Sequence, residues 1–135
     1  MKKFKTGKTL IIVLASVVVL FAVSVMAMNV WIRSDVKKNI SIAREKYPGT
    51  VEEALISFLQ DEKNSYNDRT HVAIWTLGML KSTKALPVLK GYYHDDPKGL
   101  TCHGHHDQML CQYGLHKAII QIEGRWMYST AGLNR

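Results

Sequence analysis

The chain has few cysteines and lacks the residue alternation that is typical of β-sheets. Its 135 residues include only two cysteines. Two cysteines can form at most one disulfide, which excludes a disulfide-dense scaffold. No segment alternates between polar and apolar residues over the length of a strand, so half-buried β-strands are not expected. The sequence therefore predicts an all-α fold.

Acidic residues are absent from the beginning of the chain, where none precedes Asp35. Residues 1–8 contain four lysines, and residues 9–32 contain no charged side chain. About 20 consecutive apolar residues are enough for a helix to cross the hydrocarbon core of a bilayer. We therefore expect a basic cytoplasmic N-terminus over 1–8, a transmembrane anchor in the lipid bilayer over 9–32 and one soluble domain over 33–135.

The same N-terminal segment also fits a cleaved signal peptide, after which the protein would be secreted. The small-residue motif VMA at 25–27 matches the usual cleavage pattern. However, the apolar run continues past this motif to Ile32, and Trp31 is typical of a membrane interface. These features favour an uncleaved anchor. The lysines before the span place the N-terminus in the cytoplasm and the C-terminal domain on the extracytoplasmic side.

The positive net charge does not indicate a nucleic-acid partner. The chain has 18 basic and 11 acidic residues, a net charge of +7, and four of these charges lie in residues 1–8. In the soluble part the two signs are mixed along the sequence. A nucleic-acid surface needs basic residues gathered on one face, so no nucleic-acid partner is expected.

Four segments of the soluble part place apolar residues at helical spacing, namely 51–59, 68–81, 83–93 and 107–122. A fifth, 34–47, is predicted to be helical, either separately or as a continuation of the membrane span. The segment 68–81 is apolar on two faces, which predicts a central helix packed on both sides. The side-chain oxygens of Asp68, Thr83 and Asp107 are expected to cap the helices that follow them.

Residues 71–93 resemble a HEAT-like repeat of the armadillo type. The matching features are Leu77-Gly78, a short turn, and the sequence ALPVL at 85–89. In apolar pattern alone the resemblance covers about two and a half repeats, residues 35–124. It implies a short α-solenoid of stacked helix pairs, a fold that serves as a scaffold. Residues 126–128 are expected to fold back as a terminal cap.

The repeat spacing predicts an insertion loop over residues 94–106. Ala54-Leu55 recurs after 31 positions as Ala85-Leu86, whereas the sequence at 76–80 matches 118–122 after 42 positions. The 11 extra residues fall between Tyr93 and Asp107. Insertions in repeat proteins form loops on one face, which is often the binding face.

Residues 100–111, at the end of this loop and just after it, contain both cysteines and three of the six histidines. Three interpretations of the cysteines stay open: a disulfide between Cys102 and Cys111, two free thiols, or ligands of zinc or another transition metal. The metal ligands would be Cys102, His103, His105 and His106. Cys111 falls on the apolar stripe of the predicted helix 107–122, which favours core packing for its side chain.

The sequence predicts a membrane-anchored protein-protein interaction module, an adaptor or assembly factor, rather than an enzyme. No orienting acid or oxyanion donor accompanies Cys102 at a recognisable spacing, and no cofactor is expected. Tyr92, Tyr93 and Trp126 are the candidate contacts to a partner protein. Trp75 is a fourth aromatic candidate, but burial in the core is favoured for it. The alternative is a metal- or haem-handling protein that uses residues 102–111.

Overall fold

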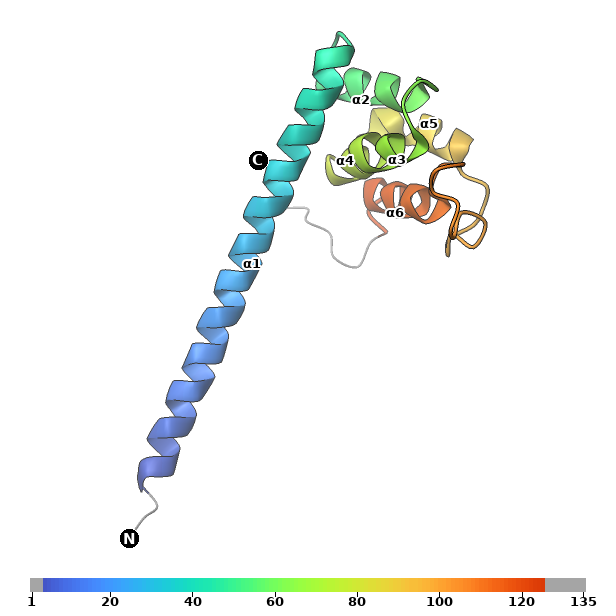
Figure 1. Ribbon diagram of the computed structural model, residues 1–135. Helices are drawn as coiled ribbons and strands as arrows, with labels where there is room; N and C mark the ends of the chain where they lie inside the picture. The colour runs from blue at the N-terminus through green and yellow to red at the C-terminus, as the bar shows by residue number, and fades with distance from the viewer. Residues whose placement is uncertain (1–3, 126–135) are drawn as a thin grey trace. The chain divides into compact units, whose positions relative to one another are not determined.

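The computed structural model describes residues 4–125, with side chains from residue 7 onward (Figure 1). The predicted cap at 126–128 lies outside the described residues. The chain divides into two compact units, residues 1–35 and 36–135. Each unit is described by itself below. All regular structure within the described residues is helical, as the sequence predicted.

The first unit is the apolar part of α1, the helix Phe4–Lys46. Its most apolar stretch has a mean hydropathy of 3.0, and none of that stretch is buried within the protein. The polar side chains on it are satisfied locally. Ser16, Ser24 and Asn29 each donate a hydrogen bond of 2.8 Å to a backbone carbonyl three or four residues earlier. By length and composition, α1 is a candidate membrane span or signal anchor.

The predicted helix at 34–47 is not a separate element, because α1 continues without a break to Lys46. The last turns of α1 belong to the second unit, which begins at Val36. Ala43 is completely buried there, and the side-chain amide of Asn39 donates to the hydroxyl of Thr76 over 3.0 Å. α1 ends before Pro48, as expected, because the residue before a proline disfavours the helical conformation.

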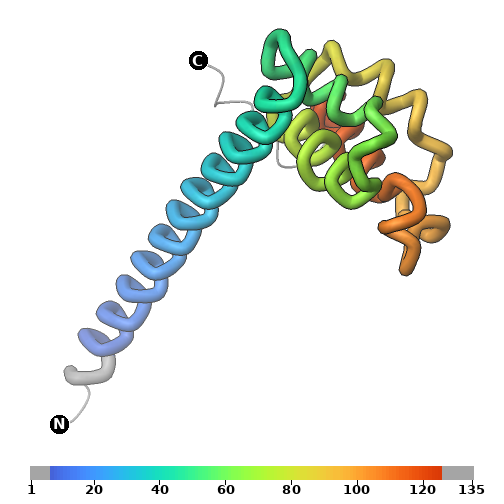
Figure 2. Tube along the Cα trace, turned by 45° about the horizontal axis from the view of Figure 1, so that its top comes forward, coloured from blue at the N-terminus to red at the C-terminus, as the bar shows by residue number. Residues whose placement is uncertain are grey.

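Up to residue 125, where the described part of the chain ends, the second unit contains seven further helical elements. They are α2 (Val51–Gln60), α3 (Tyr66–Asp68), η1 (Arg69–Ile74), α4 (Trp75–Met79), η2 (Thr83–Ala85), α5 (Leu86–Tyr92) and α6 (Gln112–Ile122). α2, α4, α5 and α6 lie together as one packed group (Figure 2). η1 and α4 form the centre, because they contact α2 on one side and α6 on the other. This confirms the prediction of a central helix.

The core is built from the predicted apolar stripes. Leu55, Leu77, Leu89 and Leu115, one from each of the main helices, are completely buried. Helices α4 and α6 approach closely at Gly78, where an added Cβ atom would lie 3.0 Å from the Cα of Ala118. Only glycine fits such a contact without a shift of the backbone.

The helix caps are not the residues predicted from the sequence. Asp68, Thr83 and Asp107 were expected to cap, whereas the side chains that accept the capping bond belong to Ser65, Ser82 and Cys111. Ser65 and Ser82 precede the expected residues, whereas Cys111 follows the expected Asp107 by four positions. Asp68 itself has a helical backbone and its side chain makes no cap bond to η1. Thr50 and Glu53 form a complete capping box at the start of α2.

A π-helical segment that the sequence did not predict joins α3 to α4. η1 spans Arg69–Ile74, and the N–H of Trp75 donates to the carbonyl of Thr70, five residues earlier. π-helical turns are rare and occur frequently at functional sites. This segment contains Arg69, which lines a pocket, and Thr70, whose hydroxyl accepts a hydrogen bond from the N–H of Cys111.

The segment between α5 and α6 is longer than the predicted loop 94–106. It runs from residue 93 to 111, and it extends from the edge of the helical group (Figure 2). The difference arises because residues 105–109 form a turn, in which the carbonyl of His105 accepts bonds from Gln108 and Met109. Helix α6 therefore begins five residues later than the predicted start at Asp107, and Cys111 precedes it instead of lying on its apolar stripe.

Candidate functional site

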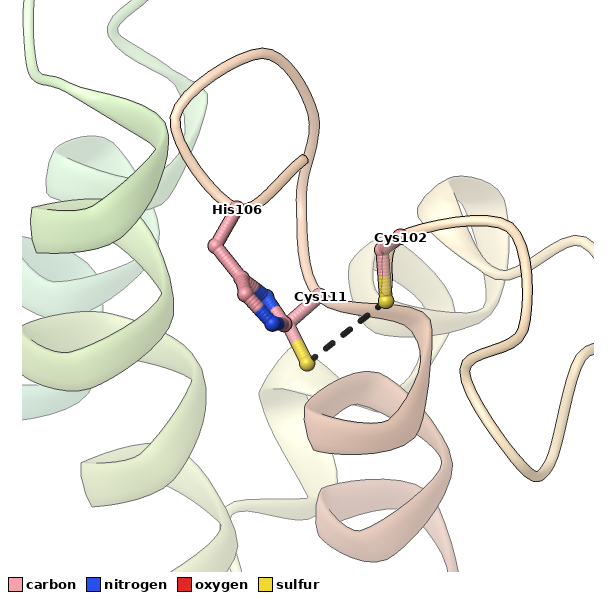
Figure 3. A group of neighbouring side chains, drawn as sticks. All are labelled: Cys102, His106 and Cys111. Atoms are coloured by element: carbon pink, nitrogen blue, oxygen red, sulfur yellow. Dashed lines mark hydrogen bonds between the residues drawn. The ribbon is translucent and has the colours of Figure 1, made fainter. Parts of the chain in front are cut away.

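Three side chains of this loop converge on one point: Cys102, His106 and Cys111 (Figure 3). Their Sγ and ring nitrogen atoms all lie within 4.8 Å of one another. The two Sγ atoms are 3.8 Å apart, and both cysteines are free thiols. Cys102 is buried, Cys111 is half-buried and His106 is exposed. The imidazole of His106 points toward the Sγ of Cys111.

Backbone N–H groups at the start of α6 donate to both sulfur atoms. The N–H of Gln112 donates to the Sγ of Cys102 over 3.2 Å, and the N–H of Gly114 donates to the Sγ of Cys111 over 3.4 Å. The N-terminus of a helix also favours negative charge through its dipole. Both sulfur atoms are therefore held by backbone donors at the start of α6.

Burial acts against ionisation of Cys111. It raises the pKa of this thiol, the hydrogen bond from Gly114 lowers that pKa, and the neighbouring thiol of Cys102 raises it. Cys111 is consequently not an activated nucleophile at neutral pH without a further cation close to its sulfur.

The cluster differs from the metal-ligand set predicted from the sequence. Cys102 and His106 belong to both sets, whereas His103 and His105 are exposed and lie outside the cluster. Cys111 replaces them. The sequence prediction placed Cys111 inside a helix, and the actual helix start turns its side chain toward Cys102. The sequence analysis had paired the two cysteines as a possible disulfide, but not as a cluster with His106.

Residues of the same loop also line a pocket of about 450 Å³. Residues of its wall include Glu62, Tyr66, Arg69, Tyr92, Thr101 and Gln112. These residues come from the α2–α3 connection, from α3, from η1, from α5 and from the loop and start of α6. The pocket therefore combines elements that are distant in the sequence.

Arg69 is the most unusual residue of the pocket, because it is charged and only 3% exposed. Its Nε donates to the carbonyl of Leu59 over 2.6 Å, at the last turn of α2. The rings of Tyr66 and Tyr92 lie 5.4 Å and 5.6 Å from its guanidinium carbon, close enough for cation–π attraction. No ion pair among the described residues includes Arg69.

The predicted partner contacts are found in different places. Tyr92 lines the pocket beside Arg69. The hydroxyl of Tyr93 lies 3.3 Å from the Nδ1 of His116, so Tyr93 joins α5 to α6 instead of lining the pocket. Trp75 is half-buried, and Trp126 lies outside the described residues. Arg69 and Tyr66 were not predicted, because the burial of a single charged side chain and the π-helical segment cannot be read from apolar spacing.

Gln112 connects the cysteine cluster with the pocket. It is buried, and its side-chain oxygen accepts a bond of 2.9 Å from the N–H of His94 while its amide donates to the carbonyl of Tyr92 over 3.2 Å. Its own N–H donates to the Sγ of Cys102. The geometry of the loop thus sets part of the pocket wall.

Comparison with known proteins gives no relative for this chain. No protein-family model matches it, no curated protein is significantly similar to it, and no solved structure matches it significantly. Its function has to be inferred from its own side chains.

Proposed function

We propose that the protein is a membrane-anchored binding module without catalytic activity, an adaptor or assembly factor, whose HEAT-like helices hold an acidic segment of a partner protein. Arg69 carries the proposal. It is a cation that is 97% removed from solvent contact, yet no carboxylate among the described residues pairs with it. Buried charges in proteins are normally paired. A carboxylate of a partner protein would complete this pocket.

The composition of the pocket agrees with this function. Tyrosine and arginine are the residue types that contribute most binding energy in protein interfaces, and here Tyr66 and Tyr92 flank Arg69. Tyr66 is 38% exposed, so its ring is accessible to a partner. A side-chain carboxylate could accept hydrogen bonds from the guanidinium while an apolar neighbour contacts the tyrosine rings.

Glu62 on the pocket wall limits the affinity for such a partner. It forms no ion pair with Arg69, and its negative charge repels an incoming carboxylate. This repulsion fits a reversible interaction. It also provides a test, because removal of the negative charge of Glu62 should strengthen binding of the acidic segment.

The anchor and the pocket together define the class of function. A span of α1 in the bilayer, with the second unit on the extracytoplasmic side, would keep the pocket close to the membrane surface. Confinement to a membrane raises the effective concentration of other membrane proteins around the pocket. The preferred partner is therefore another protein of the same membrane surface.

Site-specific photo-crosslinking in native membranes tests the proposal. A benzophenone amino acid at position 66, on the pocket wall, should give one discrete cross-linked protein. The same group at the exposed Thr83, which does not line the pocket, should give none. Equal cross-linking from both positions, or none from position 66, would contradict the proposed function.

A further inference from the structure

We propose that Cys102, His106 and Cys111 bind one zinc ion. Two thiolates and one imidazole are a ligand set that is typical of zinc. The inference does not depend on the protein partner proposed above, because it involves a different group of side chains.

The separation of the two sulfur atoms fits a tetrahedral metal. Two thiolates that each lie about 2.3 Å from a tetrahedral zinc ion are about 3.8 Å from one another, and the Sγ atoms of Cys102 and Cys111 are 3.8 Å apart. A ring nitrogen bound to the same ion would be about 3.6 Å from each sulfur. All three ligand atoms already lie within 4.8 Å, so a rotation of the exposed His106 side chain is sufficient.

The backbone around the sulfur atoms is suited to thiolates bound to a metal. The N–H groups of Gln112 and Gly114 each donate to one of the two sulfurs, and such outer hydrogen bonds hold metal ligands in position. The N–H of Cys111 itself lies 3.4 Å from the hydroxyl of Thr70, which attaches the site to η1. The two sulfur ligands are therefore positioned before a metal binds.

Zinc binding would exchange protons for the metal. Each thiol loses its proton to solvent as its Sγ binds Zn²⁺, and the neutral imidazole of His106 donates a lone pair. No electrons are transferred, so no oxidant is needed. Among the described residues, three side chains reach the site, which leaves the fourth position of a tetrahedral ion to water.

The loop contains its own matched controls. His103 and His105 are exposed, like His106, but do not belong to the cluster. Replacing either by alanine removes the same kind of ligand without touching the proposed site. His106→Ala should not unfold the protein through lost packing, because its side chain is exposed, whereas Cys102→Ser changes a buried group.

The test uses the full chain, purified in detergent with a thiol reductant and freed of metal by a chelator. Titration with Zn²⁺ should give one bound ion per chain, and Co²⁺ should give the absorption of a thiolate-bound tetrahedral ion. His106→Ala and Cys111→Ser should each lower the zinc affinity by more than about tenfold, as expected for loss of a direct ligand. His103→Ala and His105→Ala should leave the affinity unchanged.

Three results would overturn the inference. The first is the absence of stoichiometric zinc binding by the reduced chain. The second is a zinc affinity that is the same in the unmodified chain and in all four variants. The third is a Cys102–Cys111 disulfide in protein isolated from its membrane with thiols blocked at lysis, because oxidised sulfurs do not bind zinc in this way.

Discussion

The backbone N–H of Gln112 donates to the Sγ of Cys102 over 3.2 Å, so the first residue of α6 is attached directly to the loop that precedes it. The side chain of Gln112 meanwhile bonds to the backbone of His94 and Tyr92. One buried residue therefore links the end of α5, the loop and the start of α6. Any change at the cysteine cluster should be transmitted to the pocket that contains Tyr92.

Replacement of Gln112 should destabilise the second unit. Gln112→Leu removes both side-chain hydrogen bonds and leaves the N–H of His94 and the carbonyl of Tyr92 without these partners. We expect the free energy of unfolding to fall by about 2 kcal/mol. Gln112→Glu keeps an acceptor for His94 but places a buried carboxylate beside the carbonyl of Tyr92, so it should also destabilise the unit. Urea unfolding of the full chain in detergent, followed by circular dichroism, measures both; equal stability of Gln112→Leu and the unmodified chain would contradict this role.

Substitution of Gly78 should disturb the contact between α4 and α6. The added Cβ of Gly78→Ala would lie 2.8 Å from the Oε1 of Gln121 and 3.0 Å from the Cα of Ala118. Overpacking of this kind costs about 1–3 kcal/mol. The same unfolding measurement gives the value.

Gly91 provides the matched control for this prediction. It lies in α5, and an added Cβ there would have no neighbour within 4 Å. Gly91→Ala should therefore raise the stability by about 0.5–1 kcal/mol, the usual gain from replacing a glycine inside a helix. If both variants changed stability in the same direction, the close approach of α4 and α6 at Gly78 would be wrong.

The ion pair between Glu53 and Lys84 should contribute to the pH dependence of stability. The hydrogen bond from Lys84 and the bonds from Thr50 lower the pKa of Glu53 from the usual 4.5 to about 2. Because the folded-state pKa is the lower one, this contribution is present above about pH 4.5 and is lost as the pH falls toward 2.

Lys84→Met should raise the pKa of Glu53, although the capping bonds from Thr50 should keep it below 4.5. A titration of the side-chain carboxyl carbon of Glu53 by NMR measures this shift. Lys90→Met is the control, because Lys90 pairs with Glu123 over 2.6 Å and does not contact Glu53. A Glu53 pKa unchanged by Lys84→Met would show that the ion pair does not form in solution.

The sequence predicted the helical elements better than their ends. The stripes of Leu55, Leu77 and Leu115 identified the core, because burial of one helix face produces a spacing that is visible in the sequence. The helix starts were displaced because several residues could serve as caps. Ser65 and Ser82 precede the expected Asp68 and Thr83, and only the course of the backbone selects among them.

The candidate site was predicted in part. The spacing argument found the inserted loop, and the cysteines drew attention to residues 102–111. A Cys102–Cys111 pair was among the open interpretations, as a disulfide, but the cluster of Cys111 with His106 was not predicted, because it depends on the late start of α6. Arg69 was not predicted either, since its burial results from the packing of Tyr66 and Tyr92 around it, and nothing in the local sequence indicates that contact.

The most direct test of the account is the affinity of the cross-linked partner protein for the full chain in lipid nanodiscs. We expect Tyr66→Ala to weaken binding by about tenfold or more, as for other aromatic contacts at the centre of an interface. Glu62→Gln should tighten it, because the charge that opposes the carboxylate is removed, and Thr83→Ala should leave it unchanged. Binding that is insensitive to Tyr66→Ala, or weakened by Glu62→Gln, would contradict the proposal that the Arg69 pocket receives an acidic segment.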